Sequence, residues 1–271
     1  MNFGDLNPRF PSPVRFLAWN ILHGGGPARM PEIAHAIAAH APDVVTLSEV
    51  RRTTGGQIAG ALADIGLSHW SWTNPPAGIN GVLIAARTPF ETLRFPPPVS
   101  QRLLAARFAA LDLNLIAAHV PPDPGSERAH AWKSLLDYAK SRRFERTLVL
   151  GDLNAGRDGD LHALKLDGQE SLGKLWTWGF RDLFRKENTG LPEFSWLTPD
   201  RQGGGRIDHA IASASLSAVA ASVRYSHVER DLRISDHSIL LVDLVVSSTR
   251  DHVPGNASTE PTRGGGTLFS P

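Results

Sequence analysis

Short apolar runs rich in strand-forming residues recur along this chain, and a polar residue borders nearly every one of them. The run Thr147–Leu150 is too short for a helix, and Gly151-Asp152-Leu153-Asn154 follows it directly. Asp152 and Asn154 are two positions apart, so in extended chain their side chains face the same way. Ligands of α/β sheets collect at strand ends. The string therefore predicts a site that orients a water and a phosphate oxygen, although an ordinary turn is an open alternative.

Five further runs end or begin in the same way, which is hard to obtain by accident. They are Val14–Trp19 before Asn20, Asp43–Ser48 before Glu49, Leu113–Ala118 before His119, Arg206–Ala212 around Asp208, and Ser235-Asp236-His237 before Ser238–Val246. A carboxylate beside an apolar run is costly to bury unless it pairs or binds a cation. The pattern therefore predicts one polar site assembled from several strand ends.

The order of the predicted segments favours an α/β class with mixed sheets, because strands and helices alternate in the first part of the chain and strands dominate later. Helices are predicted at Pro31–His40, Gln57–Ile65 and Ser126–Arg143, with Ser126 as the N-cap. One strand is expected at Leu103–Leu113, and Leu172–Phe184 is expected to be partly helical.

Chain length and composition fit one domain with a full core, since the chain has 271 residues and 41% hydrophobic content. We expect an irregular lead-in at residues 1–12, a catalytic domain at residues 13–247 and a disordered tail at residues 248–271. The tail is polar and Gly-rich, so it cannot bury enough apolar surface to order itself.

Charge and cysteine content limit the function classes. The formal net charge of +1 neither indicates nor excludes a nucleic-acid binder, since acidic residues can concentrate in a metal site. The absence of cysteine excludes disulfides and cysteine nucleophiles. No run approaches the ~20 apolar residues that span a bilayer, and no secretory signal is recognisable. A cytoplasmic monomer without a membrane span is expected.

The polar motifs, in their order along the chain, resemble those of the endonuclease/exonuclease/phosphatase superfamily. The resemblance runs from about Val14 to Val246 and is carried by Asn20, Glu49, His119, Gly151-Asp152-Leu153-Asn154, Arg206-Ile207-Asp208 and Ser235-Asp236-His237. It implies a four-layer α/β sandwich, in which two mixed sheets pack face to face with helices outside. It also implies hydrolysis of phosphodiesters or phosphomonoesters with a divalent cation, usually Mg²⁺, with Mn²⁺ as an alternative.

Within the superfamily, three stretches look most like the exonuclease III and apurinic/apyrimidinic endonuclease branch. They are Gly179–Arg185, Phe194-Ser195-Trp196, and Arg206-Ile207-Asp208 with Ala212-Ser213 after it. This likeness implies a DNA nuclease acting internally or from 3′ ends, with abasic sites as a candidate target. Two positions depart from the branch, which usually has Tyr in place of His119 and Gln in place of Ser48. Deoxyribonuclease-type members and many phosphodiesterases have His at the position of His119. A small-molecule or lipid phosphate ester therefore stays open as the substrate.

The resemblance and the residue chemistry together imply roles around one cation. Glu49 is the expected main metal ligand, with Asn20 and Asp236 near the same ion. The expected catalytic residues are Asp152 on the attacking water, Asn154 on the water or phosphate, His237 on a phosphate oxygen, Asp208 on His237, and His119 on phosphate or leaving group. His119 has a purely structural alternative.

Two residues are expected to contact the substrate. An aromatic ring at Trp196 can pack on a flipped-out sugar or base, although ordinary core packing is the alternative. Arg206 flanks the Gly203-Gly204-Gly205 turn and is expected to bind the negatively charged substrate.

Overall fold

A computed structural model gives the fold of residues 13–246, so the expected lead-in (1–12) and tail (248–271) lie outside the described residues. The first sheet, in spatial order, consists of β14 (Ala220–Ser226), β15 (Ile239–Leu244), β1 (Val14–Asn20), β2 (Val44–Val50), β4 (Gly81–Ala86) and β3 (His69–Trp72). The second consists of β10 (Arg181–Asp182), β13 (Asp208–Ala212), β8 (Thr147–Asp152), β7 (Leu113–His119), β6 (Leu103–Phe108) and β5 (Glu91–Arg94). A small third sheet holds β11 (Trp196–Leu197), β12 (Gly204–Gly205) and β9 (Leu161–His162).

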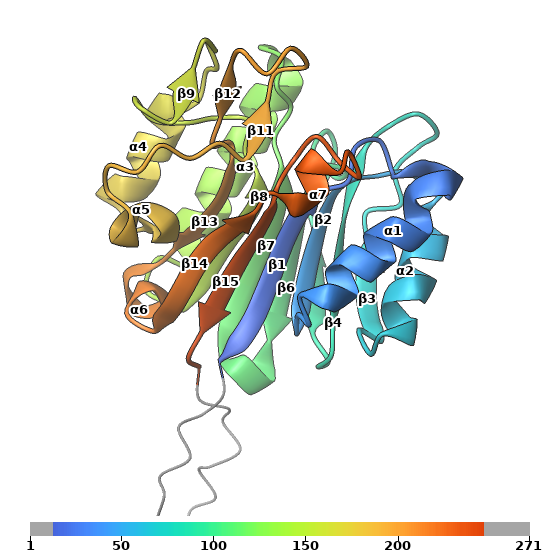
Figure 1. Cartoon of the computed structure of the whole chain (residues 1–271). Coiled ribbons are helices and arrows are strands. Elements are labelled where there is room, and N and C mark those ends of the chain that lie inside the picture. The colour runs from blue at the N-terminus through green and yellow to red at the C-terminus, as the bar shows by residue number, and fades with distance from the viewer. Residues whose placement is uncertain (1–12, 247–271) are drawn as a thin grey trace, which may run out of the picture.

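The described helices lie on the outer faces of the two large sheets or at their edges (Figure 1). They are α1 (Gly26–Ala39), α2 (Gly55–Asp64), α3 (Ser126–Ser141), α4 (Gln169–Thr177), α5 (Leu183–Glu187), α6 (Ala214–Ser217) and α7 (Val228–Asp231). Ile37 of α1 and Leu62 of α2 pack in one core with β1 and β2. Trp132 of α3 and Leu175 of α4 pack in another core with β7 and β8.

The largest core lies between the two sheets and joins them face to face. Phe16 of β1 and Leu240 of β15 share it with Leu104 of β6 and Leu115 of β7. Both sheets are mixed, because β1 and β2 run parallel, as do β7 and β8, while the other pairs of the two large sheets are antiparallel. The predicted four-layer α/β sandwich is therefore confirmed.

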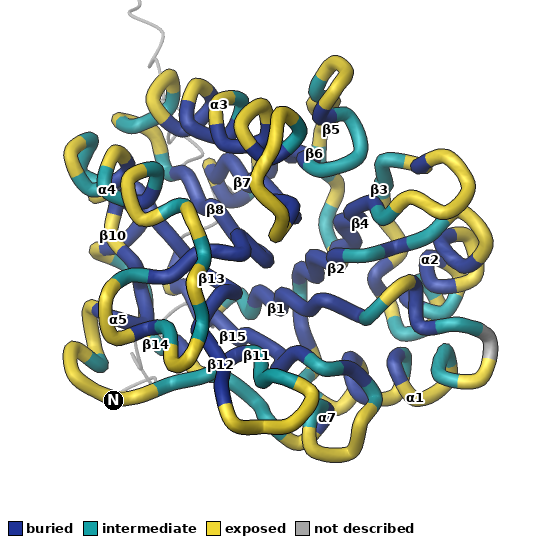
Figure 2. The backbone as a smooth tube through the Cα atoms, turned by 90° about the horizontal axis from the view of Figure 1, so that it is seen from above, coloured by how far each residue is buried: buried dark blue, intermediate teal, exposed yellow. Residues whose placement is uncertain are grey.

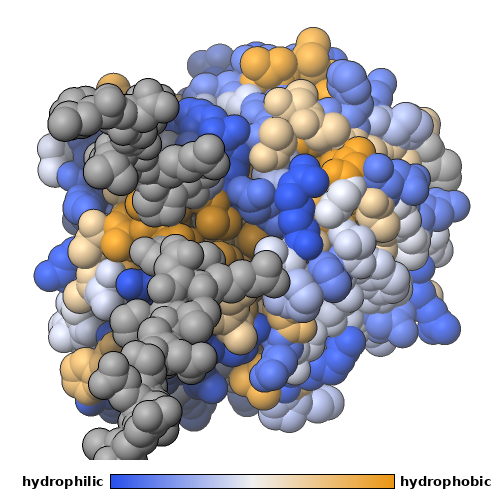
Figure 3. Space-filling model, turned by 90° about the horizontal axis from the view of Figure 1, so that it is seen from below, coloured by the Kyte–Doolittle hydropathy of each residue, from blue (hydrophilic) through white to orange (hydrophobic). Residues whose placement is uncertain are grey.

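This topology gathers the polar strand ends at one edge of the sandwich. The carboxyl ends of the parallel strands β1, β2, β7 and β8 point to the same end of the molecule, and buried segments of these strands fill its centre in Figure 2. Strands β13 and β15 run the opposite way, so their first residues arrive at the same edge. The opposite end (Figure 3) shows apolar surface near its middle with hydrophilic side chains around it.

Several element boundaries differ from the sequence prediction. The apolar stretch Leu103–Leu113 is not one strand, because a 3₁₀ turn at Ala109–Leu111 and left-handed Asp112 separate β6 from β7. Ser126 is not the N-cap of α3, since Gly125 occupies that position. Helix α1 begins at Gly26 and includes Pro31 inside it. The partly helical stretch resolves into α4 and α5, with left-handed Gly179 and β10 between them.

Within residues 13–246, no helix combines the length and the apolar character that crossing a bilayer requires.

Candidate active site

A cavity of about 270 Å³ opens at the edge where the strand ends meet. Seven of the residues singled out from the sequence line it: Asn20, Glu49, Asp152, Asn154, Trp196, Asp236 and His237. His119 and Asp208 do not line the cavity but contact residues that do. The structure thus brings together nine of the ten expected site residues, from elements that span most of the chain.

Asp152 stands at the centre of the site and is 1% exposed. Its Oδ2 accepts hydrogen bonds from Asn20 Nδ2 at 3.0 Å and Asn154 Nδ2 at 3.2 Å, and its Oδ1 accepts one from Asn154 N at 2.9 Å. Burial and the neighbouring charge of Asp208 raise the pKa of Asp152 to about 7. The carboxyl group is therefore held in place by amides while its charge is destabilised.

The backbone around Asp152 is shaped for this placement. Gly151 has φ +135°, and a Cβ there would lie 2.3 Å from the Ala118 carbonyl oxygen of the parallel neighbour β7. Asn154 adopts φ +45°, a left-handed conformation that Asn tolerates better than most residues. The string Gly151-Asp152-Leu153-Asn154 therefore combines a close strand contact with a turn that returns the Asn154 side chain to Asp152.

Glu49 reaches the cavity because of an irregularity in β2. The register between β2 and β4 shifts between Ser48 and Val50, and Glu49 has φ +63°. Such a bulge re-aims one side chain out of the sheet alternation. Glu49 Oε2 accepts a hydrogen bond from the backbone N–H of His23 at 2.7 Å. Burial raises the pKa of Glu49, but the charge of His119 and the His23 N–H outweigh it, so the net shift is downward.

His237 and Asp208 form a buried ion pair beside Asp152. His237 Nδ1 donates to Asp208 Oδ2 at 2.8 Å, and His237 Nε2 lies 3.9 Å from Asp152 Oδ2. Burial lowers the pKa of His237, but the charges of Asp208, Asp152 and Asp236 outweigh it and raise the pKa to about 10. The pKa of Asp208 shifts downward, because the charge and hydrogen bond of His237 outweigh burial. His237 is consequently a cation with its Nε2–H directed toward Asp152.

This pairing also bears on where a cation can bind. Asp152, Asp208 and His237 form a buried group whose ligand atoms lie within 4.8 Å of one another. An imidazolium that donates through Nδ1 cannot ligate a metal with that nitrogen. His237 Nδ1 is therefore not available as a ligand atom in this group.

His119 lies at the end of β7, beside the cavity-lining residues Glu49 and Asp152. Its Nε2 is 3.8 Å from Glu49 Oε1 and 4.0 Å from Asp152 Oδ2. Burial lowers the pKa of His119 to about 4, because the opposing charge of Glu49 does not compensate for it and Arg102 adds to the decrease. His119 is therefore neutral at neutral pH, unlike His237.

Trp196 and Asp236 form the rim of the cavity. The indole Nε1 of Trp196 donates to Asp236 Oδ2 at 3.0 Å, and Trp196 forms an isolated β-bridge with His237. Both side chains are only partly buried, so Trp196 faces the cavity rather than a closed core.

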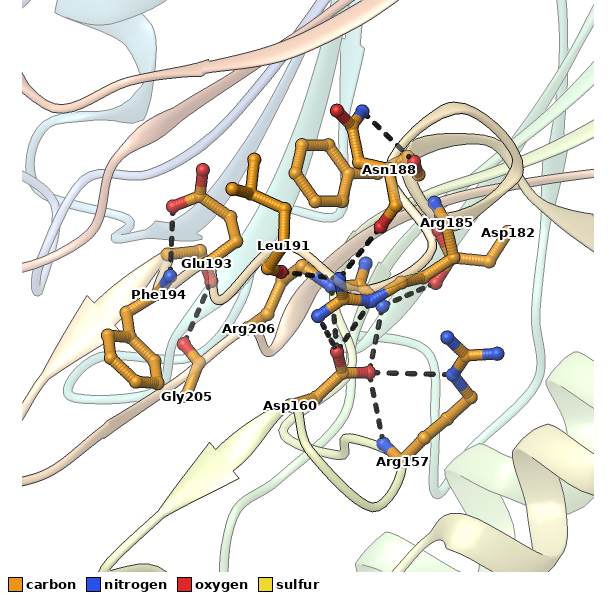
Figure 4. A network of polar contacts seen from close by, with 12 residues as sticks. Arg157, Asp160, Asp182, Arg185, Asn188, Leu191, Glu193, Phe194, Gly205 and Arg206 are labelled. Atoms are coloured by element: carbon orange, nitrogen blue, oxygen red, sulfur yellow. Dashed lines mark hydrogen bonds and ion pairs between the residues drawn. The ribbon is translucent and has the colours of Figure 1, made fainter.

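Arg206 corrects the sequence prediction, because it is not placed to bind substrate. Its side chain is 0% exposed and donates to Asp160 Oδ2 at 2.8 Å and to Asp182 Oδ2 at 2.6 Å. Arg185 also donates to Asp160, so these side chains form a closed ionic network (Figure 4). Arg206 is therefore a structural residue of the segment that precedes Asp208.

Several supporting residues were missed by sequence reasoning. Ser195 Oγ accepts hydrogen bonds from the backbone N–H groups of Ile207 and Asp208 at 3.0 Å each. Tyr225 donates to the Asp208 carbonyl at 2.6 Å, and Trp19 Nε1 donates to the His237 carbonyl at 3.0 Å. Ser195 lies in a motif that the sequence singles out, whereas nothing local in the sequence connects Tyr225 or Trp19 to these partners.

The chain also matches a known protein family. A model of the endonuclease/exonuclease/phosphatase family matches residues 17–237. The chain belongs to this family. It is accordingly a hydrolase of phosphoric esters, and the superfamily predicted from the sequence is confirmed.

Solved structures of the same fold are similar to this member of the family. An AP endonuclease from Archaeoglobus fulgidus has a TM-score of 0.74 at 20% identity, covering 85% of this chain and 99% of that chain. A 3′ phosphatase from Neisseria, bound to product DNA hairpin, and a 3′-5′ exonuclease from Neisseria meningitidis each have a TM-score of 0.72 at 20% identity, with the same coverage. Comparison with curated proteins finds no significant match.

Proposed function

We propose that this chain is a divalent-cation-dependent phosphodiesterase acting on DNA. The observation that carries the proposal is the convergence of Glu49, Asp152 and the Asp208–His237 pair on one cavity. A carboxylate that orients water and a cationic donor that meets developing negative charge are what phosphodiester hydrolysis requires. DNA as the substrate is supported by the similar structures, which are an AP endonuclease, a 3′ phosphatase and a 3′-5′ exonuclease.

In this proposal, Asp152 orients the attacking water and accepts its proton, with the Asn20 and Asn154 amides holding the carboxyl group. His237 donates through Nε2–H to a non-bridging phosphate oxygen and stabilises the charge that develops there. Asp208 keeps the imidazole charged and correctly oriented, as a carboxylate does for a catalytic histidine. His119 is neutral, so it acts as a hydrogen-bond donor and not as a charge.

The donor set around Glu49 fits a hard cation. Glu49, Asn20 and Asp236 all offer oxygen atoms to the cavity, and Mg²⁺ prefers oxygen ligands. Glu49, Asp152 and Asp236 line the cavity, and Asp208 contacts the lining residue His237. His237 is the main positive charge that balances these carboxylates, because none of the described lining residues is Lys or Arg. We propose Mg²⁺, with Mn²⁺ as a substitute. When bound, the ion would polarise the phosphate and stabilise its charge.

Within the DNA substrates, abasic sites and 3′ ends are the proposed targets, because Trp196 at the rim can pack against an unstacked sugar or base. A small-molecule or lipid phosphodiester is the second candidate. The presence of His119 and the formal net charge of +1 favour it, since duplex binders usually have a basic surface. A monomer is proposed because one chain supplies the whole site, and the cytoplasm because the cysteine-free sequence suits a reducing compartment.

A substrate panel tests the proposal. The purified protein with Mg²⁺ is offered abasic duplex, intact duplex, single strands, a 3′-phosphorylated strand and a chromogenic small phosphodiester. Cleavage of one or more DNA substrates is expected, and incision only at the abasic position would identify the target. Hydrolysis of the small diester without any DNA cleavage would replace DNA by the second candidate, and inactivity on all of them would refute the proposal.

Glu49→Gln is expected to shift the cation dependence of activity. The substitution removes one negative ligand charge but keeps the size of the side chain, so half-maximal activity should need at least about tenfold more Mg²⁺. Activity is measured across a Mg²⁺ titration, with Glu91→Gln on the exposed strand β5 as the matched control. A titration curve that coincides with that of the control would exclude Glu49 as the main ligand.

A further inference from the structure

Arg102 lies directly beside His119, across the end of the β6–β7 ladder. The backbone N–H of His119 donates to the Arg102 carbonyl at 2.9 Å. The Arg102 Nη1 group lies 3.3 Å from His119 Nδ1. The guanidinium is fixed from the other side, because Arg102 Nε donates to Glu127 Oε1 in the first turn of α3 at 2.7 Å. Glu127, Arg102 and His119 thus form a chain of contacts that leads to the cavity.

The chemistry of this contact determines where the imidazole carries its hydrogen. A guanidinium is always protonated and has donors only, so His119 Nδ1 must be the acceptor. A neutral imidazole with an accepting Nδ1 carries its hydrogen on Nε2. That nitrogen is the one that lies 3.8 Å from Glu49 Oε1 and 4.0 Å from Asp152 Oδ2. His119 therefore presents an N–H group, and not a lone pair, toward the polar site.

The two site histidines are fixed in opposite ways by their Nδ1 partners. At His237 the partner is the Asp208 carboxylate, which accepts a hydrogen bond from Nδ1 and favours the charged ring. At His119 the partner is the Arg102 guanidinium, which donates to Nδ1 and favours the neutral ring. Both hydrogen-bond arrangements leave an Nε2–H group near Asp152, so the site holds one charged donor, His237, and one neutral donor, His119.

We propose that Arg102, anchored by Glu127, is a positioning residue that fixes His119 as a neutral Nε2–H donor to the substrate. The role of His119 rests on the phosphodiesterase function proposed above. The fixed tautomer excludes His119 Nε2 as a proton acceptor in the resting enzyme. It assigns that nitrogen to hydrogen bonding with a phosphate oxygen or the departing oxygen.

Ring-nitrogen NMR of ¹⁵N-histidine-labelled protein tests the tautomer without any turnover. The His119 signals, identified by their loss in His119→Gln, are expected to show hydrogen on Nε2 and a bare Nδ1 at neutral pH. Arg102→Met removes the donor and should shift His119 to a mixture of tautomers or to the charged ring, whereas Arg102→Lys should restore much of the Nε2–H form. Arg107→Met, on the strand β6 that follows Arg102, is the matched control and should leave the His119 tautomer unchanged.

Glu127→Gln is a second, milder variant, because Glu127 is only partly buried and Gln keeps the size of the side chain. It should loosen the guanidinium and shift the tautomer in the same direction. Hydrogen on Nδ1 in the wild-type protein would overturn the proposal. A His119 tautomer unchanged in both Arg102→Met and Glu127→Gln would overturn it as well.

Kinetics then separate positioning from a merely structural role. Arg102→Met is expected to lower kcat about tenfold to a hundredfold, the usual effect of losing an outer partner of a site histidine, with KM nearly unchanged. In a His119→Gln background the amide carries its own N–H groups, so Arg102→Met should then cost only about twofold, a non-additive result. Fully additive losses would refute the coupling. An enzyme inactive on every substrate would refute the proposed function but leave the tautomer result intact.

Discussion

Asp152→Asn is expected to lower kcat on the preferred DNA substrate by about three to four powers of ten, at the upper end for loss of a general base. Asn keeps the shape of the side chain but cannot accept the proton of the attacking water, and its NH2 group loses the hydrogen bonds that one carboxylate oxygen accepts. The measurement is single-turnover cleavage with saturating Mg²⁺. Asp158→Asn, exposed in the loop that follows, is the control and should remain as active as the wild type.

The same substitution is expected to leave the fold intact or to stabilise it. Burial and Asp208 raise the pKa of Asp152 to about 7, above its unfolded value of about 3.9. A carboxyl group with a raised folded pKa contributes stability while it is protonated and loses that contribution as the pH rises through the folded pKa. The amide introduced by the substitution cannot ionise, so the variant should gain in Tm relative to the wild type above neutral pH. Activity within tenfold of the wild type would remove Asp152 from the catalytic role.

Most of the site was predictable because each of its residues belongs to a short strand-end motif. The sequence places Asn20, Glu49 and Asp152 at the ends of apolar runs, and parallel strands bring such ends to one edge. What the runs do not reveal is the bulge that turns Glu49 into the cavity, since it depends on the pairing of β2 with β4.

Arg206 was misassigned because charge is visible in a sequence and burial is not. An arginine beside a triple-glycine turn is typical of a substrate-binding loop. Its actual partners, Asp160 and Asp182, are 46 and 24 positions away, in segments with no predicted link to it. The contact between Arg102 and His119 was invisible for a similar reason, because it forms only when β6 and β7 pair.

Errors in the fold prediction were local and had the same origin. The turn at Ala109–Leu111 consists of apolar residues without Gly or Pro, so the sequence contains no turn signal that separates β6 from β7. At α3, Gly125 takes the N-cap position and leaves Ser126 as the first helical residue. Neither error displaces a strand end, so neither affects the predicted position of the site.

Arg206→Met is expected to destabilise the fold by roughly 3–5 kcal/mol, the cost of leaving buried charges without their partner. Arg206 joins Asp160 and Asp182, and both carboxyls are nearly inaccessible to water. The free energy of unfolding is measured by urea titration at neutral pH. Arg201→Met is the matched control, because Arg201 forms a solvent-exposed pair with Asp231 and its loss should cost no more than about 1 kcal/mol.

The pH dependence of the stability lost in Arg206→Met shows whether Arg206 acts through the buried carboxylates or through packing. Burial raises the pKa of Asp182, but the hydrogen bond from His209 and the charge of Arg206 outweigh it, so the folded pKa lies below the unfolded value of about 3.9. A group with a lowered folded pKa contributes stability above the unfolded pKa and loses it as the pH falls through the folded one. The stability gap between wild type and Arg206→Met should therefore narrow as the pH falls below about 4. A gap that stays constant down to acid pH would show that Arg206 acts through packing and not through the carboxylates.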